Sequence, residues 1–408
     1  MSVRVGFEVG FRVKILFLSS SEYGDIISGV GVIVTNTLRC LASIPYVESA
    51  LGIFRPLDLF KADVLPDNLP RSLPPVKKIF TITGEPLNKL HMLRGLVQIS
   101  SNEEKHFLRS VEEVSKNYDV AIWFGNGYDP VNVKLPSRCN CPILFHITDS
   151  LSLYQRMQIT KRFKNLRTWM AEKYEGRILA SGYARVVYVA QADCDIGISL
   201  STPQNSAKVI CLPNGVDLKA FCPGSPLKSG SGKIVMLFTG VMFYQPNVDA
   251  ALYLIREIMP NVHGDIELRI VGRAPTGEIL EAAKADARIV VTGTVQDMTV
   301  EHQAADIFIA PMISGSGIKN KILQAMACGL PVITTPACVR AFPETPAGVL
   351  VGDNAEQMVT IIERLIGSEV ERSQLGRDGR AFIEKNWSWE QRTEKLVKIC
   401  ADVKEGVL

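Results

Sequence analysis

The chain has 408 residues, which is long for one compact domain and predicts two or three domains of about 150 residues each. Hydrophobic residues make up 47% of it and charged residues 21%, as is typical of globular proteins with well-filled cores. The net charge of +3 is too small to indicate nucleic-acid binding, so we expect no nucleic-acid partner.

The nine cysteines, from Cys40 to Cys400, lack the spacing of a disulfide framework or a zinc site, and we expect reduced thiols. Charged residues such as Arg4, Glu8 and Arg12 interrupt the first segment, so no signal-peptide core is expected there. No apolar run approaches the ~18 residues of a membrane span. These features predict a cytoplasmic location.

In the first half, apolar runs at 14–18, 120–124, 142–147 and 185–190 predict strands, each followed by a polar loop and helical periodicity. After the first run comes a loop containing Gly29-Val30-Gly31, and then a helical pattern. A strand, a glycine-containing loop and a helix are how an α/β nucleotide- or sugar-binding domain opens. The Pro-rich residues 55–100 remain unassigned.

Residues 213–233 concentrate Pro, Gly, Ser and Lys and are the best linker candidate. A second α/β series follows, with predicted strands at 233–238, 266–271, 288–291, 306–310 and 331–334. Gly240, Gly272 and Gly293 come directly after strands of this series. Each could simply make a tight turn, but three in one domain favour a ligand edge, because ligands bind outside the carboxyl ends of parallel strands.

A loop of small residues, Ser314-Gly315-Ser316-Gly317, leads from the strand at 306–310 into a helix. Such a loop exposes backbone N–H groups and directs a helix N-terminus at the ligand edge, which suits a diphosphate. Lys321 and Gln324 share one helix face with Gly317. They could contact phosphate and ribose oxygens, or be an ordinary solvated pair; the spacing alone leaves both interpretations open.

Residues 311–335, PMISGSGIKNKILQAMACGLPVITT, resemble the signature of glycosyltransferase family 4 within the GT-B superfamily. ICLPNGVD (210–217), IVMLFTGVMFYQPNVDAA (234–251) and ELRIVGRAP (267–275) resemble further family segments in the same order. The match covers nearly all of residues 208–390 and is weak over 1–205. It implies an α/β fold of GT-B type, with two Rossmann-like domains facing across a cleft.

The resemblance implies an acceptor-binding domain over residues 1–207 and a nucleotide-sugar-binding domain over 208–388, with the helix at 389–408 packing back on the first. The resemblance also implies that His146 lies beside the donor sugar, and Asp149 is the alternative candidate for the catalytic residue. The implied donor-binding residues are Gly29, Gly31, Gly240, Gly272, Arg273, Gly293, Thr294, Ser314, Gly315, Ser316, Gly317, Ile318, Lys319, Lys321 and Gln324.

Two departures from the family pattern matter. Ser316 and Gln324 stand where the family has a pair of glutamates, and Val241 stands where it commonly has a cation. Lys319 and Lys321 could supply the positive charge for the leaving diphosphate. No Asp-x-Asp motif of the kind that metal-dependent transferases use is present, so we expect no metal. We expect no other cofactor either.

The resemblance implies a retaining transferase that moves a hexose from a nucleotide-sugar, UDP by default and GDP as runner-up, to a glycan or lipid-linked acceptor in polysaccharide biosynthesis. Catalysis would rest on positioning and charge stabilisation, with the leaving phosphate as base. Two alternatives stay open: a GT-B-type nucleotide-sugar epimerase, and a weakly active donor-binding partner subunit.

The segment 152–174 is typical of a basic amphipathic helix, with apolar residues between Arg156, Lys161, Arg162, Lys164, Arg167 and Lys173. Such a helix can lie on an anionic membrane, which would put the protein at the inner face of the membrane as a peripheral protein. A solvated helix with an apolar core face explains the pattern equally well.

Overall fold

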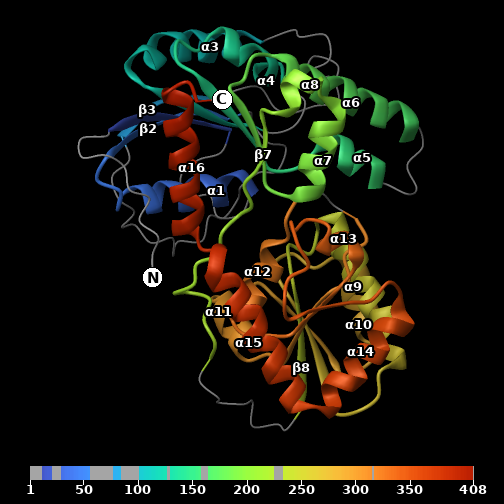
Figure 1. The fold of residues 1–408 in the computed structure, drawn as a ribbon. Coiled ribbons are helices and arrows are strands. Elements are labelled where there is room, and N and C mark those ends of the chain that lie inside the picture. Colours follow the sequence, from blue (N-terminus) through green and yellow to red (C-terminus); the bar gives the residue numbers. More distant parts are fainter. Residues whose placement is uncertain are drawn as a thin grey trace. The chain divides into compact units, whose positions relative to one another are not determined.

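The computed structural model describes residues 12–20, 29–55, 77–83, 101–125, 129–157, 164–224, 233–314 and 317–407 (Figure 1). The chain divides into two compact units, one of Met1–Leu212 with Trp389–Leu408 and one of Pro213–Ser388. The first boundary thus falls after Leu212 and not after residue 207. Both units are parallel sheets with helices, which confirms the predicted α/β class.

Seven strands form the sheet of the first unit within the described residues, in the order β3-β2-β1-β4-β5-β6-β7. They are β1 (Val13–Ser19), β2 (Val47–Arg55), β3 (Lys77–Thr83), β4 (Val120–Gly125), β5 (Ile143–Ile147), β6 (Arg185–Tyr188) and β7 (Val209–Cys211). All pairings are parallel. The four strands predicted in this half are confirmed, while β2, β3 and β7 were not predicted.

The helices of the first unit are α1 (Gly29–Leu41), α3 (Asn102–Val114), α4 (Val131–Lys134), α5 (Leu151–Met157), α6 (Lys164–Ala180), α7 (Gln191–Leu200), α8 (Pro203–Ser206) and α16 (Trp389–Lys404). Two short 3₁₀ turns, η1 (Ser115–Asn117) and η2 (Leu135–Ser137), follow α3 and α4.

Side chains alternate between the two faces of this sheet, because successive residues of a strand point in opposite directions. On one face Leu16, Trp123 and Phe145 join a core cluster with residues of α3 and α6. On the other face, rings of neighbouring strands stack: Phe17 on Phe124 at 6.0 Å, and Phe124 on His146 at 4.9 Å. Both faces are apolar, which explains why these strands are continuous hydrophobic runs in the sequence.

Two helices distant in sequence cover the face that carries this row of rings. α1 and α16 lie side by side in Figure 1, and α16 also packs on β1 and β4. The first unit is therefore completed by residues 389–404, which follow the whole second unit in the sequence.

The second unit has a six-stranded parallel sheet with the order β10-β9-β8-β11-β12-β13. Its strands are β8 (Ile234–Thr239), β9 (Ile266–Val271), β10 (Ile289–Gly293), β11 (Ile307–Ala310), β12 (Val332–Thr334) and β13 (Val349–Val351). The five predicted strands are confirmed, and β13 is additional. The order reverses between β8 and β11, and such a reversal is where open α/β sheets bind their ligands.

The helices of the second unit are α9 (Gln245–Tyr253), α10 (Gly277–Ala283), α11 (Met298–Gln303), α12 (Asn320–Ala327), α13 (Pro336–Val339), α14 (Ala355–Gly367) and α15 (Glu369–Asn386). α9 continues through a π-helical turn, η3 (Leu254–Ile258), into a 3₁₀ turn, η4 (Met259–Asn261).

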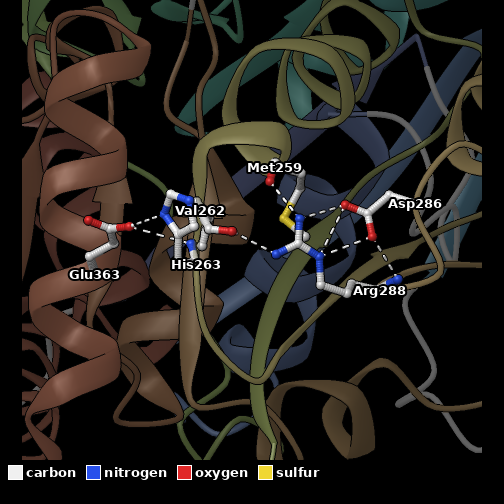
Figure 2. Close-up of polar contacts among 6 residues, drawn as sticks. All are labelled: Met259, Val262, His263, Asp286, Arg288 and Glu363. Carbon is white, nitrogen blue, oxygen red and sulfur yellow. Dashed lines mark hydrogen bonds and ion pairs between the residues drawn. The ribbon is translucent and has the colours of Figure 1, made fainter.

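A guanidinium joins segments at the amino edge of this sheet (Figure 2). Arg288, just before β10, pairs with Asp286 at 2.6 Å and donates hydrogen bonds to the carbonyls of Met259 and Val262, which precede β9. Next to them, His263 contacts Glu363 of α14 at 3.0 Å. These polar groups have hydrogen-bond or ion-pair partners within the unit. A ligand is therefore expected at the opposite, carboxyl edge of the sheet.

None of the helices in the described part of the chain is both long enough and apolar enough to cross a membrane.

Candidate functional site

A lysine ammonium lies at the carboxyl edge of the second sheet, where the strand order reverses. Lys321, in the first turn of α12, donates a hydrogen bond to the Oδ1 of Asn247 on α9 at 2.8 Å. Its Nζ also lies 4.5 Å from the centre of the Phe238 ring of β8. A Cβ placed on Gly240 would lie 2.7 Å from the Nδ2 of Asn247 and 2.9 Å from this Nζ, so a larger residue there would displace both side chains.

The pKa of Lys321 is lowered to about 7, first because burial disfavours the charged form and second because Lys319 lies nearby. Around Lys321 the structure has an amide oxygen and an aromatic face but no carboxylate partner among the described residues. A cation held this way is stabilised when an anion arrives. The arrangement suits a phosphate group.

The loops that follow β8, β9 and β10 are joined by their backbones. Gly240 N donates to Val271 O, and Gly272 N donates to Gly293 O, both at 3.0 Å. Gly272 has a φ of +151°, and a Cβ there would meet the carbonyl oxygen of Gly240 at 1.7 Å. Gly293 has a φ of 72°. These predicted glycines therefore share one edge, and at Gly272 the close approach of two loops requires the absence of a side chain.

Arg273 follows Gly272 and lies over the ring of Phe243, 5.5 Å from its centre. Its Nε is buried without a hydrogen-bond partner among the described residues. The next residue, Ala274, has a φ of 53°, the one positive φ of a non-glycine residue in the described chain. Backbone strain of about 1–3 kcal/mol at a ligand edge is common at functional sites.

The loop between β11 and α12 is only partly described. Gly315 and Ser316 lie outside the described residues, and Ser314 before them is half-buried. Gly317 has a φ of 72°, Ile318 is buried, and Lys319 precedes the first residue of α12. The structure thus brings Gly317, Lys319 and Lys321 to one edge.

Gln324 lies one turn further along α12 and is half-buried, a position compatible with a ribose contact and with a solvated side chain. Thr294 follows Gly293 and is exposed. The proposed roles of both residues stay predictions.

In the first unit, the two predicted catalytic residues differ in exposure. His146 is fully buried in β5, and its Nε2 contacts the guanidinium of Arg392 on α16. Burial and the charge of Arg392 hold the pKa of His146 well below its usual range. Asp149 is exposed in the loop after β5. Gly29 and Gly31 lie in the first turn of α1, and the loop before them, 21–28, is outside the described residues.

Two buried carboxylates hold the loop that carries Asp149. Glu175 of α6 accepts hydrogen bonds from the Ser150 hydroxyl at 3.1 Å and from the Ser152 N–H at 2.9 Å. Asp193 of α7 accepts from the Ser150 N–H at 2.7 Å. Burial raises the pKa of Glu175. Glu175 and Asp149 also line a small hollow beside the ends of β4 and β5.

The sequence reasoning missed Asn247, Arg392 and Glu175. Asn247 stands in the segment 234–251, which resembles a family segment, but nothing in the spacing indicates that its side chain is buried. Arg392 and Glu175 stand in charged helical segments, where an exposed side chain is the ordinary expectation.

The described residues contain no group of three or more His, Cys, Asp or Glu side chains that could hold a metal ion. Metal independence stays a prediction.

Residues 233–368, within the second unit, match the family model described as glycosyl transferases group 1. Among solved structures, the whole chain resembles sucrose-phosphate synthase from Thermosynechococcus elongatus, with a TM-score of 0.73 at 17% identity, covering 97% of this chain and 100% of that one. It also resembles Anabaena HepE in complex with UDP, with a TM-score of 0.68 at 16% identity, covering 95% and 100%. The fold is therefore GT-B.

Among curated proteins, a GDP-mannose-dependent monoacylated alpha-(1-6)-phosphatidylinositol monomannoside mannosyltransferase of Corynebacterium glutamicum is 28% identical over 46% of this chain and 55% of its own length. A phosphatidyl-myo-inositol mannosyltransferase of Mycolicibacterium smegmatis is 28% identical over 53% and 55%. The chain thus spans about half the length of these relatives. Residues 233–368 thus resemble the group 1 glycosyltransferases, within a chain of GT-B fold.

Proposed function

We propose that this protein transfers a hexose from a nucleotide-sugar to a glycan or lipid-linked acceptor, as a retaining, metal-independent glycosyltransferase. The single observation that carries the proposal is the Lys321 ammonium. It lies between Asn247, Phe238 and the glycine edge, without a carboxylate partner among the described residues. A diphosphate leaving group placed there gains a charge partner at the atom where negative charge develops.

UDP is the proposed nucleotide and GDP the runner-up. The solved structures of Anabaena HepE include complexes with UDP and with UDP-glucose. The Corynebacterium relative is named as GDP-mannose-dependent. The departure at Ser316 bears on the sugar, because the family has an acidic side chain there. The departure at Gln324 bears on the ribose, because a neutral amide makes weaker hydrogen bonds to hydroxyls than a carboxylate does.

Calorimetry with UDP-glucose, UDP-GlcNAc and GDP-mannose, in the presence of EDTA, tests the donor site. One donor is expected to bind, and Lys321→Ala is expected to weaken it at least tenfold, about 1.4 kcal/mol. Lys284→Ala is the matched control, since Lys284 pairs with Glu281 at the far end of α10 and its loss leaves binding unchanged. Binding that appears only with added magnesium would overturn the metal-independent mechanism.

Product analysis by NMR separates transfer from the alternatives. A retaining transferase releases the nucleoside diphosphate in an acceptor-dependent manner and keeps the anomeric configuration of the donor. An epimerase would instead change the sugar without an acceptor. If no donor binds the wild-type protein, the favoured alternative is a partner subunit whose donor site is disabled.

An anionic membrane is the proposed location of a lipid-linked acceptor, with the protein cytoplasmic and peripheral at the inner face. The expected single helix over 152–174 is wrong in one respect: α5 and α6 are separate helices that pack against each other, joined by the Arg156–Glu172 pair at 2.6 Å. One face of α6 carries two apolar side chains, Leu166 and Trp169, each 54% exposed.

Lys173 and Arg177 continue the same face of α6, at helical spacings of four from Trp169, and both are exposed. This α6 face therefore presents two apolar side chains followed by two cationic ones. The combination suits insertion between lipid headgroups, because Trp lies well at a membrane interface and cations attract anionic lipids. Of the other cations of the predicted segment, Lys164 begins α6 and Arg167 is exposed on it, while Lys161 and Arg162 lie outside the described residues.

A further inference from the structure

A guanidinium on the last helix of the first unit, Arg392, is buried without a carboxylate partner among the described residues. Arg392 is 2% exposed, and its Nη1 donates to the Thr37 hydroxyl of α1 at 3.1 Å. Its Nη2 contacts the Nε2 of His146, and the guanidinium carbon lies 5.5 Å from the centre of the Trp389 ring. In the part of the chain that the structure describes, no acidic side chain is among its hydrogen-bond or ion-pair partners.

The chemistry of this contact permits one arrangement of protons. A guanidinium carries only N–H donors and stays charged, so the atom facing it must offer a lone pair. The Nε2 of His146 is therefore unprotonated, and the proton of the neutral imidazole is on Nδ1. A protonated imidazole would bring two positive charges into contact in a buried site.

We propose that Arg392 is a positioning residue that holds His146 as the neutral Nδ1–H tautomer at the end of β5. His146 then has no free lone pair for accepting a proton, and its only available group is the Nδ1–H donor. That Nδ1 is buried and has no hydrogen-bond partner among the described residues. Any part that His146 plays in transfer rests on the proposed function, but its tautomer does not.

Packing alone does not account for an arginine at this position. Burying an uncompensated cation is costly, and an apolar side chain of similar length would fill the space between α1 and β5 without that cost. Burial lowers the pKa of Arg392 to about 9, so the guanidinium is still charged near neutral pH. What a cation adds, and an apolar residue would not, is control over the protonation of the imidazole.

The tautomer is measured directly by ¹⁵N NMR of the full-length, donor-free protein with labelled histidine. The chain has five histidines, and His146→Asn assigns the signal of interest. We expect a protonated Nδ1 and an unprotonated Nε2 that do not titrate between about pH 5.5 and 8, the range in which histidines ordinarily change charge. A protonated Nε2, or titration in this range, overturns the proposal.

Two variants separate positioning from packing. Arg392→Lys keeps a donor facing Nε2 and is expected to keep the single tautomer, whereas Arg392→Met is expected to lose it. A Met variant that keeps a pure Nδ1–H signal overturns the proposal. If the Met variant does not fold, the wild-type and Lys spectra still decide.

Arg372→Met is the matched control, because Arg372 is also a buried arginine, and its hydrogen-bond partners among the described residues are the carbonyls of Leu365 and Ile366 in the second unit. It can lower stability but leaves the His146 signal unchanged. In turnover assays Arg392→Met lowers kcat about tenfold or more, while donor affinity changes less than about twofold. If the wild type binds no donor, the proposed function fails while the spectra still test the tautomer.

Discussion

Lys321 donates a hydrogen bond to Asn247 across two helices that follow different strands of the same sheet, one after β11 and one after β8. The Nδ2 of Asn247 in turn donates to the carbonyl of Val241, 2.9 Å away. The amide thus orients the ammonium and ties it to the loop after β8. Where the sequence lacks a cation in that loop, it has an amide that holds a cation from another helix.

Donor binding is expected to take up a proton through Lys321. With its pKa at about 7, the free amine is largely neutral at pH 8, and a bound diphosphate raises that pKa. Calorimetry at pH 8 in buffers of different ionisation enthalpy should reveal uptake approaching one proton, and little uptake at pH 6. Lys321→Met removes the uptake. If the binding enthalpy of the wild type at pH 8 is the same in all buffers, the prediction is wrong.

The same lysine is expected to make stability depend on pH. Its folded pKa is lowered from 10.5 to about 7, so between these values the unfolded chain binds more protons and stability rises with pH. Below pH 7, burying the charged lysine lowers the free energy of unfolding by its full amount. That amount is about 1.4 kcal/mol for each pKa unit between the unfolded and the folded chain. Denaturant unfolding should show that the free energy of unfolding of Lys321→Met, relative to that of the wild type, falls from pH 7 to pH 10.

Gly272→Ala is expected to destabilise the second unit by about 3 kcal/mol or more. The new methyl would meet the Gly240 carbonyl oxygen, and the backbone there has a φ that other residues rarely adopt. Gly277→Ala is the matched control: nothing lies within 4 Å of its Cβ position, and it begins α10. Thermal unfolding compares the two, and equal midpoints would show that the loops do not approach as described.

Glu175→Gln is expected to gain stability relative to the wild type as pH rises. Burial raises the pKa of Glu175 in the folded chain. The protonated side chain therefore contributes its full stabilisation below the unfolded pKa of 4.5, and the wild type loses this stabilisation as pH rises through the folded pKa. The control Glu172→Gln removes an exposed pair with Arg156 on the neighbouring helix, worth about 0.5 kcal/mol. A constant difference between Glu175→Gln and wild type from pH 4 to 8 would contradict this assignment.

The α6 face is expected to bind anionic vesicles. Replacing Leu166 and Trp169 together by Ser should weaken sedimentation with phosphatidylglycerol vesicles about tenfold or more, because each buried apolar side chain contributes roughly 1.5–3 kcal/mol. The matched control replaces Val370, exposed on α15 of the second unit, and should change nothing. Equal binding to neutral and anionic vesicles would exclude a role for Lys173 and Arg177.

The sequence predicted most strands correctly because buried parallel strands are unbroken apolar runs, as VAIWF and IELRIV illustrate. It did not predict β7 and β13, which have three residues each and little burial, so their pattern carries no signal. The pairing of Lys321 with Asn247 spans 74 residues and that of His146 with Arg392 spans 246. Periodicity reports neighbours within one element, so contacts of this kind do not show in it.

The helix pattern over 152–174 shows a different limit. Arg156 and Lys173 share a basic, amphipathic stretch, yet they lie on two helices that pack together, and Glu172 neutralises Arg156. Charge counting could not distinguish a continuous helix from a hairpin.

Because α16 belongs to the first unit, the two units differ in when they can be completed during synthesis. Residues 213–388 are contiguous and can fold as soon as they have left the ribosome. The first unit must wait with the face between α1 and β4 uncovered until residues 389–404 have been made. A fragment ending at Leu212 would keep that apolar face open to solvent, so the first unit should aggregate when produced without residues 389–404, unless the α16 segment is supplied, fused or in trans.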